Sequence, residues 1–158
     1  MDLESKGLRL EVTVVKETIN GFTLRSCVSW LEDEISGMIV VEIGIPSGFE
    51  ANRWGISEHK MLKRTEIEDR KVILYYEEVK SVELCTDLRF VRDKLVAKTK
   101  PVPCKAYEYY EPSNEVTVFY APLSAKNANI CDICGAECGC QTSKEKIWFP
   151  QSWCKKKI

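Results

Sequence analysis

The chain has 158 residues, enough for one domain and an appendage, and its 44% hydrophobic and 30% charged residues are typical of a globular protein with a core. A net charge of −1 at pH 7 excludes the strongly basic surface that nucleic-acid binding usually needs. No stretch approaches the roughly 20 apolar residues that span a bilayer, and we interpret Lys155, Lys156 and Lys157 as a solvated terminus. We therefore expect no nucleic acid and no membrane among the partners.

The N-terminal part of the chain shows the pattern of a β-hairpin. Residues 7–14 (GLRLEVTV) alternate apolar and polar side chains, which predicts a half-buried strand. Asn20 and Gly21 follow and predict a two-residue turn, because both residues tolerate a positive φ. Residues 22–30 (FTLRSCVSW) are then the returning strand.

Further strands follow at short intervals. Residues 38–45 (MIVVEIGI) are rich in β-branched side chains, and Pro46, Ser47 and Gly48 predict the turn that ends them. Later strands are predicted in KVILYYEEV (71–79), VELCTDLRFV (82–91), CKAYEYYE (104–111) and EVTVFY (115–120). About seven strands with short turns favour an antiparallel sandwich.

One short helix is predicted over residues 56–64 (ISEHKMLKR). Ser57 can cap its N-terminus, and Met61 and Leu62 can face the core. His59 lies on this segment with no nucleophile or acid at a useful spacing, so we interpret it as a surface side chain. We predict a non-enzymatic protein without a cofactor.

The composition changes near Ala121 and Pro122. Residues 123–158 contain five of the eight cysteines, and a segment of about 36 residues usually needs disulfides or a metal to hold itself together. The sequence therefore predicts a β-sandwich over residues 1–122 and a cysteine-rich C-terminal tail over residues 123–158.

An even number of cysteines in a chain of ordinary size favours an oxidising compartment. The first ten residues, MDLESKGLRL, lack the apolar core of a signal peptide. Both observations agree if the chain is a fragment of a secreted protein.

The tail segment CDICGAECGC allows three interpretations. A zinc site usually needs two separated Cys-x-x-Cys pairs, and the spacing here is tighter. A redox site needs a Cys-x-x-Cys at a helix start after a strand, and no such context precedes it. We favour structural disulfides, with a small intracellular zinc-binding protein as an alternative. The tail cysteines are Cys131, Cys134, Cys138, Cys140 and Cys154.

Several stretches occur together in a familiar order: Gly37-Met38, Ser47-Gly48-Phe49, Lys60-Met61-Leu62 and the run YEYYEP at 107–112. With them, the chain resembles the receptor-binding domain of the alpha-2-macroglobulin and complement thioester protein superfamily, most of all the invertebrate thioester-containing proteins. The resemblance implies a macroglobulin-type sandwich near the C-terminus of a much larger secreted protein.

The relatives trap proteases or tag microbial surfaces through a Cys-Gly-Glu-Gln thioester, which this chain lacks. The resemblance therefore implies a scaffolding and contact role in innate immunity or endopeptidase inhibition. Its partners would be the neighbouring macroglobulin and thioester domains and a cell-surface receptor. The alternative is a stand-alone extracellular module that binds a receptor or a surface.

The resemblance also assigns individual residues. Cys27 and Cys85 match a disulfide pair of complement relatives, and Cys104 is then the cysteine of the sandwich left to tie the tail through a bridge. The pairing of the tail cysteines stays open.

Receptor uptake in vertebrate relatives depends on two lysines four positions apart on one helix face. Lys60 matches the second lysine, whereas Ile56 occupies the place of the first. Lys63 and Arg64 are candidates to replace it, against the alternative that all three are ordinary exposed residues. In the tail, Trp148 and Trp153 are expected to dock on the sandwich or to contact other parts of the parent protein.

Overall fold

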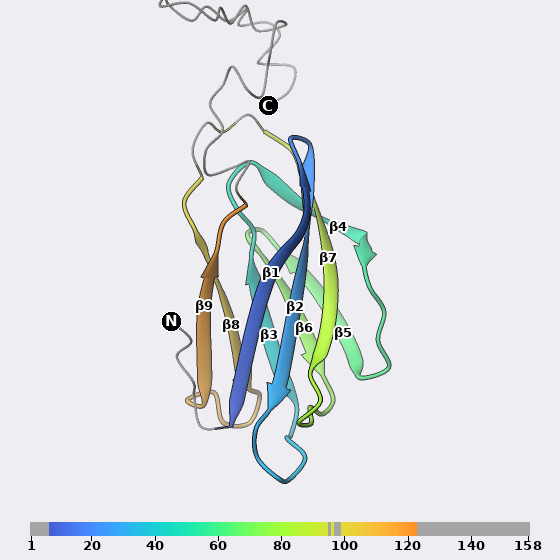
Figure 1. Ribbon diagram of the computed structural model, residues 1–158, viewed down its shortest axis with the longest axis vertical. Coiled ribbons are helices and arrows are strands. Elements are labelled where there is room, and N and C mark those ends of the chain that lie inside the picture. Colours follow the sequence, from blue (N-terminus) through green and yellow to red (C-terminus); the bar gives the residue numbers. More distant parts are fainter. Residues whose placement is uncertain (1–6, 95, 97–98, 123–158) are drawn as a thin grey trace, which may run out of the picture.

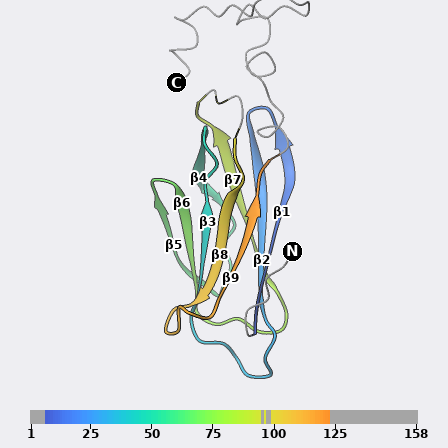
Figure 2. The same ribbon diagram turned by 90° about the vertical axis from the view of Figure 1, so that its left-hand side faces the viewer.

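The computed structural model describes residues 7–94, 96 and 99–122. Nine strands form two antiparallel sheets, which lie face to face with their loops at the two ends (Figures 1 and 2). The four-stranded sheet has the order β1 (Leu8–Thr18), β2 (Gly21–Trp30), β7 (Leu84–Arg92) and β4 (Phe49–Ile56). The five-stranded sheet has the order β5 (Leu62–Glu68), β6 (Lys71–Tyr76), β3 (Ile39–Gly44), β8 (Val102–Glu108) and β9 (Glu115–Tyr120). The predicted all-β sandwich is confirmed.

The core lies between the sheets and follows the predicted alternation. Leu8 and Leu10 of β1 are buried, whereas Arg9 and Glu11 between them are exposed. β3 is the central strand of its sheet and is buried on both faces, which explains its nearly continuous apolar sequence. Among the described residues there is no helix that is long and apolar enough to cross a membrane.

The prediction of a helix over residues 56–64 is wrong. β4 ends at Ile56, β5 begins at Leu62, and the residues between them form a turn that crosses from one sheet to the other. Ser57 caps no helix, because its hydroxyl accepts a hydrogen bond from the Asp87 N–H at 2.8 Å and its own N–H donates to the Asp87 carbonyl at 2.9 Å. Pairing of β5 with β6 outweighs the modest helix propensity of these residues.

The β1–β2 hairpin is confirmed, but its turn is displaced by one residue. Thr18 pairs with Gly21, so that Ile19 and Asn20 form the turn, and none of the described non-glycine residues has a positive φ. Gly21 serves a different purpose: a Cβ atom there would lie 2.3 Å from the carbonyl oxygen of Phe90 on β7. The glycine is required by the close approach of β2 and β7.

Gly21→Ala should therefore be strongly destabilising. We expect it to lower the free energy of unfolding by about 1–3 kcal/mol, because the backbone of β7 must move to admit the methyl group. Gly37→Ala is the matched control, since its Cβ would meet no atom within 4 Å, and it should change stability by less than about 0.5 kcal/mol. Urea unfolding followed by circular dichroism measures both, and equal effects would contradict the packing argument.

Candidate functional site

The candidate receptor residues lie at one edge of the sandwich, where β4 and β5 end their respective sheets. Lys60 is exposed in the turn, and Lys63 and Arg64 are exposed on β5. Lys63 forms an ion pair with Glu77 at 3.1 Å, and Arg64 pairs with Glu66. Lys60 has no ion pair within the described residues. A binding partner could therefore contact Lys60 without breaking an ion pair, whereas Lys63 and Arg64 would have to exchange theirs.

A hollow of about 480 Å³ lies along this edge. It is lined by Trp54 and Arg53 of β4, by His59 of the turn, and by Lys63 and Arg64 of β5. Lys60 is not part of its lining. The structure thus brings two of the three candidate cations together, and adds Arg53 and Trp54, which sequence reasoning did not select.

Trp54 is 92% exposed, the highest value among the large hydrophobic side chains of the described residues. The register of β4 with β7 is interrupted between Ala51 and Ile56, and the Trp54 N–H donates to Oδ1 of Asn52 at 3.1 Å. The strand therefore lacks the alternation that would have revealed it. Tryptophan and arginine dominate protein–protein hot spots, so this edge has the composition of a contact site.

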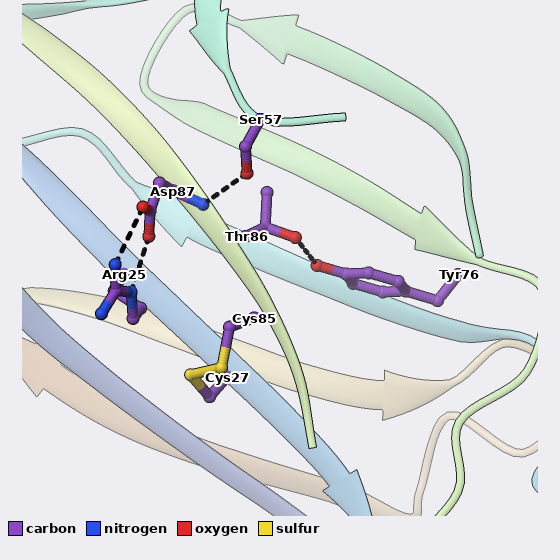
Figure 3. The surroundings of a disulfide bond; sticks show 7 residues. All are labelled: Arg25, Cys27, Ser57, Tyr76, Cys85, Thr86 and Asp87. Atoms are coloured by element: carbon purple, nitrogen blue, oxygen red, sulfur yellow. Dashed lines mark hydrogen bonds and ion pairs between the residues drawn. A yellow bond between two sulfur atoms is a disulfide. The ribbon is translucent and has the colours of Figure 1, made fainter. Parts of the chain in front are cut away.

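The edge is held in place by β7, the strand next to β4 (Figure 3). Asp87 of β7 accepts two hydrogen bonds from Arg25 of β2, at 2.8 and 3.1 Å, and its backbone binds Ser57 of the turn. The Arg25 guanidinium lowers the pKa of the Asp87 carboxyl, so the pair contributes stability at neutral pH that is lost as pH falls through the lowered value. One residue thus links two strands and the turn.

The two residues before Asp87 carry a disulfide and a hydrogen bond to the other sheet. Cys27 of β2 and Cys85 of β7 stand directly opposite each other and are disulfide-bonded, with 4.1 Å between their Cα atoms. Thr86 hydrogen-bonds the phenol of Tyr76 in the other sheet, and burial raises the pKa of Tyr76 to about 12 (Figure 3). Residues 85–87 thus connect β7 to β2, to β6 of the other sheet and to the β4–β5 turn.

The described residues contain one cluster with metal-ligand types, Cys27, Glu83 and Cys85. Both sulfur atoms are used in the disulfide, so neither offers a thiolate. His59 is exposed and its Nδ1 accepts the Met61 N–H at 3.0 Å. The zinc and redox interpretations concern residues 131–140, which lie outside the described residues, as does the whole predicted tail.

Cys104 is a free, fully buried thiol on β8, within the core between the sheets. Burial raises its pKa to about 12, which makes it a poor nucleophile. The predicted bridge from Cys104 to the tail would require a tail cysteine to enter the core, and the tail lies outside the described residues. The bridge therefore stays a prediction, and the free thiol gives the competing expectation.

Alkylation distinguishes these two states. From its burial, we expect Cys104 to resist iodoacetamide in the native chain and to react in 6–8 M urea, about the concentration that unfolds such domains, without reductant. Peptide mapping by mass spectrometry checks the modification, and Cys27 in the same digest is the control that reacts only after reduction. If Cys104 also needed reduction, the bridge to the tail would be established.

The described chain is thus a two-layer antiparallel β-sandwich with a disulfide between adjacent strands and an exposed edge that carries basic and aromatic side chains. The family model described as A-macroglobulin receptor binding domain matches residues 34–121. The chain belongs to this family, and the resemblance to the superfamily of alpha-macroglobulins and complement proteins is confirmed.

Three relatives show how the chain compares with whole proteins. It is 32% identical to thioester-containing protein 1 allele R1 of Anopheles gambiae, over 72% of this chain and 9% of that protein. It is 26% identical to complement C3 of Eptatretus burgeri, over 85% of this chain and 10% of that protein. Ophiophagus venom factor of Ophiophagus hannah is 23% identical, over 95% of this chain and 10% of that protein. The chain thus spans about a tenth of these relatives.

Proposed function

We propose that this chain is the non-catalytic receptor-binding-type domain of a much larger secreted protein that acts in innate immunity, as an opsonin, or as an endopeptidase inhibitor. Its role is to pack against neighbouring macroglobulin and thioester domains and to present a contact edge. The observation that carries the proposal is the family match over residues 34–121, in a chain that spans about a tenth of its relatives.

Two further features support the proposal. The Cys27–Cys85 disulfide suits an oxidising compartment such as the extracellular space. Two relatives are named as a complement protein and a thioester-containing protein, and this chain lacks the Cys-Gly-Glu-Gln sequence of the superfamily's thioester. Contact and support are then the functions left to this domain.

An immunoblot of the native protein tests the proposal. Antibodies against residues 7–122 are applied to extracellular fluid and to washed cells of the source organism, under reducing and non-reducing conditions. We expect an extracellular band far above the 18.1 kDa of this chain. An 18.1 kDa extracellular band alone would favour the stand-alone module instead, and a band confined to cells would overturn secretion.

The exposed β4–β5 edge favours receptor or surface contact as a second role. Trp54→Ala should reduce binding of the fluorescently labelled chain to cells of the source organism at least about tenfold, because a hot-spot tryptophan contributes more than most contacts. Phe119→Ala is the control, since Phe119 of β9 is also exposed, at 67%, but lies in the other sheet and far from this edge in strand order. Equal binding of both variants and the unchanged chain would remove this role.

A further inference from the structure

One end of the sandwich differs in charge from the rest, and we name it the acidic pole. It consists of the β2–β3 loop (residues 31–38), the β6–β7 loop (77–83) and the β8–β9 loop (109–114), at the bottom of Figure 1. Hydrogen bonds join the three loops: the Ser36 N–H donates to the Val79 carbonyl at 3.2 Å, and the Tyr109 N–H to the Met38 carbonyl at 2.9 Å. The pole is therefore one continuous surface.

The pole has an excess of negative charge. Its loops contain seven acidic residues and a single base, Lys80. Two of the acids are paired, Glu77 with Lys63 and Glu78 with Lys80. The acids without an ion pair among the described residues are Glu32, Asp33, Glu34, Glu83 and Glu111. A partner for this surface must therefore be basic.

The same surface exposes large apolar side chains. Of the ten such residues exposed in the described part of the chain, half lie on these three loops: Leu31, Ile35, Val82, Tyr109 and Tyr110. Val82 and Tyr110 are 76% and 83% exposed. Apolar groups gathered at one end and set among charges mark an interaction surface rather than scattered surface residues.

A hollow of about 490 Å³ opens within the pole. Glu32, Asp33, Glu34 and Ile35 line it together with Trp30 of β2. Trp30 is only 8% exposed, yet its indole N–H has no hydrogen-bond acceptor in the described structure. Trp30 thus adds a large aromatic side chain to the lining of an otherwise mostly acidic hollow.

The chain itself contains a segment with the complementary chemistry. Residues 144–158 (KEKIWFPQSWCKKKI) carry five lysines against one glutamate, together with Trp148, Phe149 and Trp153. The described chain ends at Pro122, just after β9, whose six residues span about 20 Å back to the β8–β9 loop. The intervening residues 123–143 can extend over roughly 70 Å, which is ample.

We propose that the acidic pole is the docking site of the chain's own basic and aromatic segment, residues 144–158. The lysines pair with the acids of the β2–β3 loop, and the aromatic side chains cover the exposed apolar residues of the pole. Docking there would hold the cysteine-rich segment against the sandwich without a bridge to Cys104. The inference does not depend on the receptor role of the β4–β5 edge, although that edge borders the pole: Glu77 of the pole pairs with Lys63 of the edge at 3.1 Å.

Zero-length carbodiimide cross-linking of the full chain, mapped by mass spectrometry, tests the contact. We expect links from Lys155, Lys156 or Lys157 to Glu32, Asp33 or Glu34 in the monomeric fraction. Glu11, Glu50 and Asp69 are exposed acids outside the pole and provide the internal control. Links spread equally over the control acids, or no links at all, would overturn the proposal. Links found only in covalent dimers would overturn docking within one chain, because the tail of a second copy would be the occupant.

A charge-reversal cycle gives an independent readout. In the variant E32K/D33K/E34K, backbone hydrogen exchange in residues 144–153 should accelerate at least tenfold, and adding K155E/K156E/K157E should restore the original rate. The control variant E11K/E50K/D69K should leave exchange unchanged. Equal acceleration in both triple variants, or failure of the combined variant to restore protection, would contradict the docking. Urea midpoints show that each variant remains folded.

Discussion

Phe22→Ala is expected to lower the free energy of unfolding by about 3–5 kcal/mol, an effect comparable with loss of the disulfide. Phe22 is fully buried on β2, and its ring stacks on Phe90 with 4.9 Å between centroids. It also meets Phe49 edge-on at 5.1 Å and Tyr120 of the other sheet at 6.1 Å. Truncation leaves a cavity among rings that the two sheets hold apart, so the structure cannot collapse to fill it.

Urea unfolding at equilibrium measures the effect of Phe22→Ala. Phe119→Ala is the matched control, because the same atoms are removed from a side chain that is 67% exposed, and we expect a change of less than about 0.5 kcal/mol. A similar loss in both variants would show that burial in this aromatic cluster is not what stabilises the sandwich.

Loss of the disulfide is expected to be comparably large. The double variant Cys27→Ala/Cys85→Ala should lose about 4 kcal/mol, because the bridge closes a loop with a sequence separation of 58 residues and so restricts the unfolded chain. In the folded state the two strands are also held by backbone pairing on both sides of the bridge. We therefore expect the variant to retain the sandwich at low temperature and to unfold at a lower urea concentration.

The unchanged chain in dithiothreitol is the control for the disulfide variant. The two should unfold at similar urea concentrations, whereas Cys104→Ala with the bridge intact tests the separate effect of core packing. If reduction left the midpoint of the unchanged chain where it was, the disulfide would contribute nothing and the loop-closure argument would be wrong.

Local sequence patterns predicted the strands that lie in the middle of their sheets and missed those at one edge. β3 and β6 have long runs of apolar residues, since both faces of β3 and the inner face of β6 are covered. β4 and β5 are edge strands with interrupted registers, and most of their residues are exposed or half-buried. Apolar and polar residues do not alternate in the short stretch 56–64, so only helix propensity favours a structure there. Propensity is a weak guide when a neighbouring strand offers hydrogen bonds.

The candidate site follows the same division. Lys60, Lys63 and Arg64 could be selected from a resemblance, because sequence order alone identifies the segment. Trp54 could not, since its exposure results from an irregular strand that turns its side chain outward. The acidic pole could not be predicted from the sequence either. Its three loops are separated by tens of residues and meet only where strands of both sheets end.

The sequence by itself determined the fold class, the family and the alternation that fills the core, because these depend on the kind and order of residues along the chain. Only the tertiary structure decided which cysteine lies buried as a free thiol, why Gly21 is a glycine, and which charged loops gather at one end. Each of these depends on contacts between residues far apart in the chain: Cys104 with the opposite sheet, Gly21 with the β7 backbone, and the β2–β3 loop with its neighbours. Local propensity carries no information on such distances, and packing of the two sheets sets them.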